Sequence, residues 1–151
     1  MLKLKLREYL SESGRSPFND WLLGLRDLRA RARVEIGLTC MITGDGKVAT
    51  SRDYQVSLIE RLADPIEAAA YLDAALEDGD RVVFLLAIRN VIQAFGGMTQ
   101  ISRRTGLNRE NLYRVLSEQG NPELNSLEKL LKALGLRLAV EVDQNIDHAA
   151  C

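Results

Sequence analysis

Apolar residues spaced three and four positions apart recur along most of the chain and predict helices. The first such helix is expected to begin with Ser16 as its N-cap and Pro17 as its first helical residue. It is expected to continue through an arginine-rich stretch until Gly37 ends it. Its apolar stripe consists of Phe18, Trp21, Leu22, Leu25 and Leu28.

Strict alternation of apolar and polar residues predicts a strand at each end of the chain. Leu2, Leu4 and Leu6 alternate with charged residues, and residues 136–142, "LRLAVEV", show the same period of two. The C-terminal strand could pair with the N-terminal strand or with a partner chain. The expected fold class is therefore mainly α, a helical bundle with a short N-terminal strand-helix unit and a short C-terminal strand.

Capping residues divide the middle of the chain into separate helices. Asp64 stands three residues before Glu67, which is the spacing of a capping box, and the helix that follows is expected to end at Gly79. Asp80 then caps a helix over residues 81–95 that is apolar nearly all round. We expect this helix to be the central buried helix of the fold.

Two short helices and one longer helix follow the central one. The first short helix is expected to end at Gly106, and the second begins after Asn108 as its N-cap. The longer helix is expected to start with a capping box of Asn125 and Glu128. About five helices are thus expected between residues 54 and 134. The residues expected to pack the two short helices inward are Ile101, Leu107, Leu112, Val115 and Leu116.

Composition is that of an ordinary folded protein, but the charge is unevenly distributed. The 151 residues are 46% apolar and 27% charged, and the formal net charge is −1. Residues 54–96 hold 3 Lys and Arg against 7 Asp and Glu, whereas residues 1–38 hold 8 against 5 and residues 97–142 hold 7 against 5. The low net charge therefore does not exclude an anionic partner for either basic region.

The scarcity of certain residues argues against several classes of protein. Two cysteines are too few for a disulfide framework, and no stretch approaches the roughly 18 apolar residues of a membrane span. We therefore expect a cytoplasmic protein without a membrane partner. The single histidine, His148, lies in a polar tail where nothing would orient it for catalysis or zinc binding. We expect no enzyme activity, no catalytic residue, no metal and no cofactor.

The second short helix carries side chains that can read DNA. Arginine forms a bidentate pair with guanine and asparagine with adenine, so this helix is expected to enter the major groove. The expected base-reading residues are Arg109, Glu110, Asn111, Tyr113 and Arg114. The expected phosphate contacts are Thr99, Gln100, Arg103, Arg104 and Asn108. The alternative is a helix pair with a charged surface and no nucleic-acid partner.

A second group of arginines lies near the N-terminus. These residues could contact phosphate, but a solvated charged face is the more common role of such a run. The sequence leaves both interpretations open. The group consists of Arg26, Arg29, Arg31 and Arg33.

Residues 51–142 carry a pattern that is shared with one known family. The stretch "GGMTQISRRTGLNRENLYRVLSEQGNPELNSLEKLLKALGLRLAVEV" resembles the phage-repressor-like helix-turn-helix of HigA-type antitoxins from addiction modules. The resemblance implies a helical DNA-binding antitoxin domain over residues 54–142, followed by a tail at 143–151. It implies that the protein binds double-stranded operator DNA as a homodimer and represses its own operon. It also implies a RelE-like or HigB-like toxin as a partner.

The N-terminal residues carry a different pattern. The stretch "REYLSESGRSPFNDWLLGLRDLRARARVEIGL" resembles the beginning of a HigB or RelE-like toxin. The later strands that carry the catalytic side chains of such toxins have no counterpart, because the chain passes into a Gly, Thr and Ser-rich linker at residues 39–53. We interpret residues 1–38 as a truncated toxin-like segment. An RNA-cleaving toxin remnant and a helical interaction module that does not bind DNA stay open as alternatives.

Overall fold

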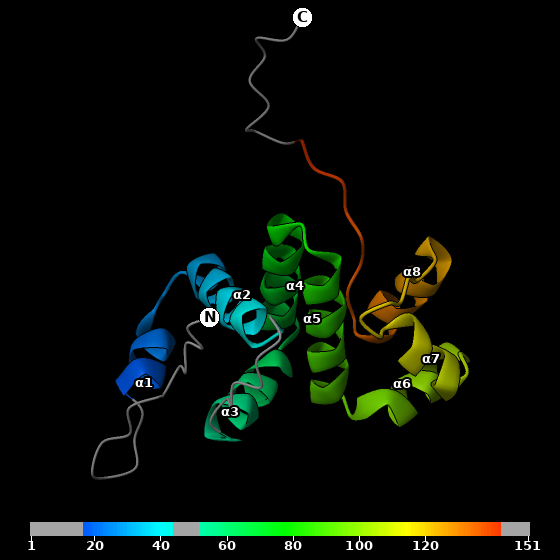
Figure 1. The fold of residues 1–151 in the computed structure, drawn as a ribbon, viewed down its shortest axis with the longest axis horizontal. Helices are drawn as coiled ribbons and strands as arrows, with labels where there is room; N and C mark the ends of the chain where they lie inside the picture. The colour runs from blue at the N-terminus through cyan, green and yellow to red at the C-terminus, as the bar shows by residue number, and fades with distance from the viewer. Residues whose placement is uncertain (1–16, 44–51, 143–151) are drawn as a thin grey trace, which may run out of the picture.

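Eight helices make up the part of the chain that the computed structural model describes, residues 17–43 and 52–142 (Figure 1). The mainly helical fold class is therefore confirmed. The helices are α1 (Pro17–Gly24), α2 (Leu28–Thr43), α3 (Arg52–Leu62), α4 (Pro65–Asp78), α5 (Arg81–Ala94), α6 (Gly97–Thr105), α7 (Arg109–Val115) and α8 (Leu124–Ala133).

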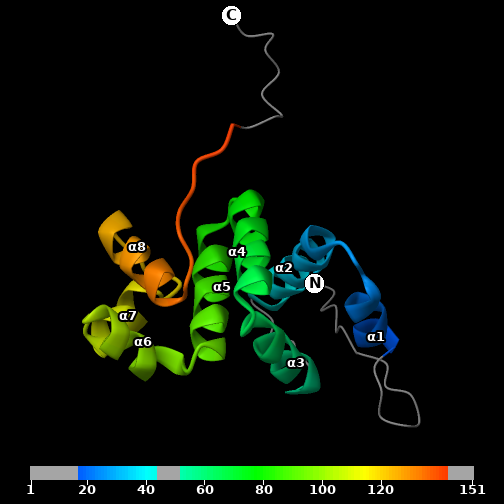
Figure 2. The ribbon, with the colours of Figure 1, turned by 180° about the vertical axis from the view of Figure 1, so that it is seen from behind.

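Helix α5 lies in the centre of the molecule, as its apolar sequence predicts. It contacts α2, α3 and α4 and also α6, and Figures 1 and 2 both place α6, α7 and α8 at the opposite end from α1. Within the described ranges, no single helix is long and apolar enough to cross a membrane. The buried residues of α5 are Val83, Leu85, Ala87, Ile88, Asn90, Val91 and Ile92.

One polar contact lies inside the interface between α4 and α5. The side-chain amide Nδ2 of Asn90 donates a hydrogen bond to the hydroxyl of Tyr71 at 3.1 Å, and the two residues are only 8% and 0% exposed. A buried polar group costs free energy unless it is hydrogen-bonded. The bond to Tyr71 therefore allows α5 to carry an asparagine on a buried face.

Two of the predicted helix caps have the expected geometry. The carboxylates of Asp64 and Asp80 each accept a hydrogen bond at 2.8 Å from the backbone amide two residues further on. Gly79 ends α4 with a φ of +78°, in the left-handed region that favours glycine. Glu67 has a different role from the predicted capping box, because its carboxylate accepts a hydrogen bond from Arg31 of α2.

The single helix predicted from residue 17 to Gly37 is in fact two helices. Helix α1 ends at Gly24, and the carboxylate of Asp27 caps α2 by accepting hydrogen bonds from two backbone amides of its first turn. The predicted end at Gly37 is wrong, because α2 continues to Thr43. A single glycine costs a helix only about 1 kcal/mol, and the packing of α2 on α4 and α5 offsets this cost.

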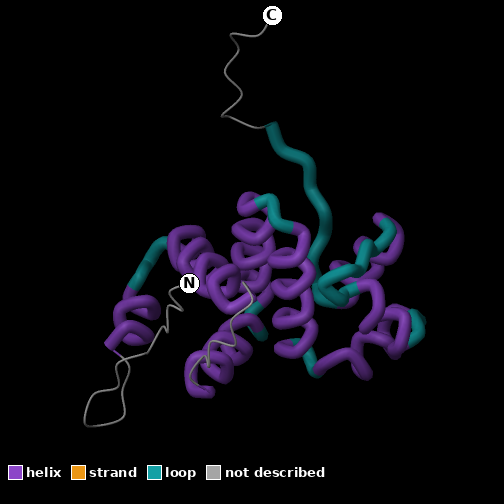
Figure 3. Tube along the Cα trace, viewed as in Figure 1, coloured by secondary structure: helices purple, strands orange, loops and turns teal. Residues whose placement is uncertain are grey.

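Neither predicted strand is found among the described residues, and Figure 3 draws only helices and loops there. The predicted C-terminal strand is not formed in the single chain, because residues 136–142 have no regular secondary structure there. A strand needs a neighbouring strand to accept and donate its backbone hydrogen bonds, and the described part of a single chain provides none. The predicted strand at Leu2, Leu4 and Leu6 and the predicted N-cap Ser16 lie outside the described residues.

Helix α3 was not predicted from the sequence. Its two buried leucines, Leu58 and Leu62, are four positions apart and each 1% exposed, a spacing that could have indicated a helix. With α3, six helices and not about five lie between residues 52 and 134. Their caps and buried stripes otherwise follow the predicted order along the chain.

The start of α8 also differs from the prediction. The amide of Leu127 donates to the carbonyl of Glu123 at 3.0 Å, so the helical ladder begins earlier than expected and Glu123 is the N-cap. Asn125 therefore lies inside the first turn, and the predicted capping box of Asn125 and Glu128 is wrong. Its apolar residues form one buried stripe, in which Leu130, Leu131 and Leu134 are buried and Leu127 packs against the same core.

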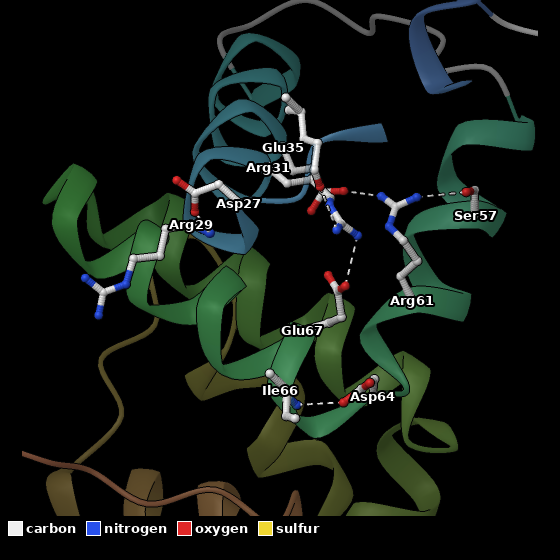
Figure 4. Close-up of polar contacts among 10 residues, drawn as sticks. Asp27, Arg29, Arg31, Glu35, Ser57, Arg61, Asp64, Ile66 and Glu67 are labelled. Atoms are coloured by element: carbon white, nitrogen blue, oxygen red, sulfur yellow. Dashed lines mark hydrogen bonds and ion pairs between the residues drawn. The ribbon is translucent and has the colours of Figure 1, made fainter. Parts of the chain in front are cut away.

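Helix α2 is held on the helical body by apolar packing and by ion pairs. Ala32 and Ile36 are 3% and 2% exposed, and α2 contacts both α4 and α5. Figure 4 shows two of the ion pairs of α2, that of Glu35 with Arg61 on α3 and that of Arg31 with Glu67 on α4. Two arginines from the N-terminal group are thus engaged within the protein. The pairs are Arg31 with Glu67, Arg33 with Glu77, and Glu35 with Arg61.

Candidate nucleic-acid interface

The candidate interface is built on α6 and α7, which a tight turn connects. Gly106 ends α6 with a φ of +70°, and its amide donates to the carbonyl of Ser102 at 2.9 Å. Asn108 begins α7, because its Oδ1 accepts a hydrogen bond from the amide of Glu110 at 2.8 Å. The predicted turn and the predicted N-cap are both confirmed.

Two hydroxyl side chains of α6 fix the shape of this turn. The hydroxyl of Ser102 donates to the carbonyl of Leu107 at 2.6 Å. The hydroxyl of Thr105 donates to the carbonyl of Ile101 at 2.8 Å and accepts from the amide of Leu107 at 3.2 Å. Sequence reasoning did not single out these residues, although Ser and Thr beside a helix-ending glycine often bond to nearby backbone groups.

Apolar packing determines where α7 lies. Ile101, Leu112 and Leu116 are completely buried, and Leu107 and Val115 pack against the same core, as predicted. A helix of seven residues is not stable by itself in water. Burial of one leucine side chain contributes about 1.5–3 kcal/mol, so Leu112 and Leu116 are sufficient to hold the helix in place.

The loop after α7 makes a close approach that only glycine permits. A Cβ atom on Gly120 would lie 2.0 Å from the carbonyl oxygen of Val115. The amide of Gly120 donates to the carbonyl of Ser117 at 2.8 Å, which completes the turn. The loop thereby brings polar residues to a shallow surface hollow beside α7. The rim of this hollow includes the predicted base-reading residues Asn111 and Arg114, and sequence reasoning missed its other polar residues, Ser117, Gln119 and Asn121.

Nearly all the predicted DNA-contacting residues are exposed. Of the predicted base-reading residues, only Asn111 is half-buried, and the exposed ones are Arg109, Glu110, Tyr113 and Arg114. The predicted phosphate contacts Thr99, Gln100, Arg103, Arg104 and Asn108 are all exposed. The structure therefore gathers both groups on α6, α7 and the turn between them, and the DNA contacts themselves stay predictions.

Several of these side chains also contact the protein itself. The guanidinium carbon of Arg109 lies 5.6 Å from the ring centroid of Tyr113. Nη2 of Arg114 donates to Oδ1 of Asn111 at 2.7 Å. Arg104 donates from Nη1 to the carbonyl of Ala133 at 3.3 Å, at the last residue of α8. Arg104 therefore helps to hold α6 against α8, in addition to its predicted phosphate contact.

The charge of this region favours an anionic partner. Residues 97–120 contain four arginines, two glutamates, and no lysine or aspartate. A surface with an excess of positive charge attracts polyanions and accelerates their association. No group of His, Cys, Asp and Glu side chains that could hold a metal ion occurs among the residues that the structure describes. The chemistry available at α6 and α7 is thus hydrogen bonding and charge.

Comparison with known proteins identifies the family of the chain. A family model described as "Probable addiction module antidote protein" matches residues 53–142, which include α6, α7 and α8. The chain belongs to this family. Membership of an antidote family implies a toxin as partner. The predicted antitoxin identity is therefore confirmed at the level of the family, and the match does not extend to residues 1–38.

A relative from Haemophilus influenzae shows how far the similarity extends. This uncharacterized protein is 34% identical over 90 residues, which is 60% of the present chain and 90% of the relative. No solved structure matches the chain. The aligned residues thus make up nearly the whole relative but only part of the antidote chain.

Proposed function

We propose that the antidote chain is a sequence-specific DNA-binding antitoxin of the HigA type, which acts in the cytoplasm. In this proposal it represses its own operon as a dimer and neutralises a RelE-like or HigB-like toxin through protein contacts. Family membership supports the antitoxin role. The DNA-binding role rests on one observation: α7 is anchored by buried Leu112 and Leu116 and exposes Arg109 and Arg114.

The dimensions of α7 suit the major groove. An α-helix with its side chains is about 10–12 Å in diameter, and the major groove is about 12 Å wide. Arg109 and Arg114 would each pair with a guanine, whereas Asn111 would pair with an adenine. Arg103 on α6 would contact the flanking phosphates. One such helix reads a half-site, so a second copy would bind about 34–36 Å away on the same face of the duplex.

One observation favours the alternative of an interaction module that does not bind DNA. Arg109 is already stacked on Tyr113, and Arg114 is already bonded to Asn111, so both arginines have partners without DNA. An exposed cation–π contact contributes only about 0.5–1 kcal/mol. A bidentate arginine–guanine pair contributes about 1–3 kcal/mol of base discrimination. The gain on binding DNA is therefore large enough to release these contacts.

The test is a binding titration with DNA from immediately upstream of the gene. The purified full chain is titrated into a fluorescent duplex of this sequence, and a scrambled duplex of equal composition is the control. We expect the upstream duplex to bind at least about 10³-fold more tightly, the lower end of the range for specific complexes. Equal affinity for the two duplexes would exclude sequence-specific binding, and no binding to either would favour the interaction module.

We also propose that residues 1–38 give the chain no RNA-cleaving activity. The sequence has no counterpart of the toxin strands that would carry catalytic side chains. The described part of this region supports a structural role, because α2 packs on α4 and its Arg31 bonds to Glu67. A translation assay with purified ribosomes tests this proposal. Cleavage of messenger RNA by the chain alone would show that a functional toxin site is present.

A further inference from the structure

The segment after α8 exposes apolar side chains at alternate positions. Leu138, Val140 and Val142 are 40%, 101% and 85% exposed, and residues 136–142 have no regular secondary structure. Figure 1 shows this segment leaving the body beside α5. Neighbouring apolar side chains that are open to water indicate an interaction surface. Unpaired backbone N–H and C=O groups make such a segment able to pair with another strand.

Two opposite charges lie at equal distances from the central residue of this segment. Arg137 lies two residues before Ala139, and Glu141 lies two residues after it. If two copies pair antiparallel with Ala139 opposite Ala139, each Arg137 faces Glu141 of the second copy. Opposite charges at directly facing positions stabilise an antiparallel pair, whereas like charges destabilise it. The sequence is therefore complementary to itself in this one register.

The apolar residues fit the same register. Alternate side chains of a strand point to opposite faces, so the exposed Leu138, Val140 and Val142 share the face opposite to the charged pairs. Leu138 of one copy would face Val140 of the other, and the reverse pair would form on the other side of Ala139. Valine, which is branched at Cβ, favours β-structure, and the segment carries it at positions 140 and 142. Two copies would thus form one apolar face of six side chains, three from each copy.

We infer that residues 136–142 are the surface through which a second copy of this chain binds, as a two-stranded antiparallel ribbon centred on Ala139. This inference rests on the proposed function, because a two-fold operator site requires two copies. It deepens that proposal by naming the surface that joins them. It also accounts for the predicted C-terminal strand, which has strand periodicity but no partner in a single chain.

The residues of α4 near this segment are compatible with the binding of a second copy to it. Burial raises the pKa of Asp73, nearby Arg29 opposes this, and the carboxylates of Glu77 and Glu141 raise the pKa further. Glu141 is therefore close enough to Asp73 to interact with its charge, and Arg137 of a second copy would face Glu141 in the ribbon. A two-stranded ribbon needs an apolar surface to be stable. Leu76, which is 51% exposed, offers one on α4, one turn beyond Asp73.

Charge exchange tests the pairing in the absence of DNA. Sedimentation equilibrium is measured for the full chain, for Arg137→Glu, for Glu141→Arg, and for the double variant. Each single variant places like charges opposite each other twice and should weaken self-association by about tenfold. An equimolar mixture of the two single variants should form a heterodimer with the parental affinity, because Arg then faces Glu at both positions. The double variant should form a homodimer again.

Cysteine cross-linking tests the register. In a chain with Cys40→Ser and Cys151→Ser, Ala139→Cys should form a disulfide-linked dimer under mild oxidation, because the two 139 side chains face each other. The control Val142→Cys should not cross-link, since the two 142 positions are six residues out of register, about 20 Å apart. Equal cross-linking of the two variants would overturn the antiparallel register. Both positions are exposed, so neither substitution disturbs the core.

The possible outcomes separate this inference from the proposed function. A monomeric parent chain, or a dimer that the charge variants do not affect, would overturn the inference and leave DNA binding to its own test. Loss of toxin binding in Arg137→Glu with unchanged self-association would show that the toxin occupies this segment instead. A dimer that responds to charge as expected but binds upstream and scrambled DNA equally would support the inference and overturn the proposed function.

Discussion

Arg61 of α3 donates a hydrogen bond from Nη2 to Oε1 of Glu35 on α2, and the two side chains are only 13% and 3% exposed. Nη1 of Arg61 also donates to the hydroxyl of Ser57 at 2.9 Å (Figure 4). Burial raises the pKa of Glu35, and the charge and hydrogen bond of Arg61 oppose this rise. The pair therefore connects the N-terminal helices with the antidote region, and Arg61 only partly offsets the cost of burying the carboxylate.

Replacement of Arg61 by methionine should strongly destabilise the fold at neutral pH. The substitution leaves the buried carboxylate of Glu35 without its guanidinium partner, and loss of one member of a buried ion pair costs about 3–5 kcal/mol. Glu35→Gln should cost less, because the neutral amide oxygen can still accept a hydrogen bond from Arg61. Urea unfolding at pH 7 measures both changes. The control is Arg81→Met, at an exposed arginine of α5, and an equal loss in this variant would contradict the prediction.

The stability contributed by Glu35 should decrease as the pH rises. The pKa of Glu35 is raised above 4.5 in the folded chain, so between the unfolded and the folded pKa the fold retains a proton that the unfolded chain has released. The contribution is therefore largest below the unfolded pKa and is lost as the pH rises through the folded pKa. We expect the free energy of unfolding of the parent, minus that of Glu35→Gln, to fall as the pH rises from about 4 through the raised pKa of the folded chain.

This pH dependence is measured by urea unfolding of the parent and Glu35→Gln across the same range. Glu60→Gln is the matched control, because Glu60 is an exposed carboxylate on α3. The difference between parent and Glu60→Gln should change less with pH. A difference for Glu35→Gln that is constant with pH would show that the carboxylate of Glu35 is as easily ionised in the folded chain as in the unfolded chain.

Removal of the Tyr71 hydroxyl should destabilise the contact between α4 and α5. Tyr71→Phe keeps the buried ring but leaves the amide of Asn90 without this acceptor at a position that is 8% exposed. An unsatisfied buried polar group costs about 1–3 kcal/mol. Thermal or urea unfolding of the variant measures the loss. Tyr113→Phe is the control, because Tyr113 is 49% exposed, and it should leave the unfolding free energy nearly unchanged.

The sequence predicts helix ends well where one local residue determines them. Gly106 ends α6 through its left-handed backbone, and Asp64 and Asn108 cap their helices through their own side chains. The extension of α2 beyond Gly37 depends instead on packing against α4. Such a contact joins residues far apart in the sequence, and local periodicity does not contain it. The C-terminal strand is missing for a related reason. Residues 136–142 have the pattern of a strand, but a strand also needs a second strand beside it, and local periodicity does not show whether one is present.

The candidate interface was predictable to a similar degree. The spacing of Leu112 and Leu116 indicates which side of α7 is buried, so the exposure of Arg109 and Arg114 follows from the sequence. The bond from Ser102 to the carbonyl of Leu107 was not predictable. It depends on the three-dimensional path of the turn, which no residue spacing specifies.

Alanine substitution of the exposed α7 arginines should change the specificity of DNA binding. Arg109→Ala and Arg114→Ala should each weaken binding to the upstream duplex by about 1–3 kcal/mol and relax the preference at one base pair. Binding to a library of duplexes with single base-pair changes measures both effects. Arg81→Ala is the control, because Arg81 is exposed at the end of α5 that is distant from α6. If both α7 variants keep the parental preference at every position, α7 is not the recognition helix.

Substitution of Arg103 should affect all DNA sequences alike. A phosphate contact carries no base information, so Arg103→Ala should weaken binding to upstream and scrambled duplexes by the same factor. It should also reduce the slope of log affinity against log salt by about 1, because one fewer counterion is released. The competing source of phosphate contacts is the pair of exposed arginines Arg26 and Arg29, since Arg31 and Arg33 are bonded to carboxylates. A reduced slope in the Arg26→Ala, Arg29→Ala double variant, with the parental slope in Arg103→Ala, would place the phosphate contacts on the N-terminal helices instead of α6.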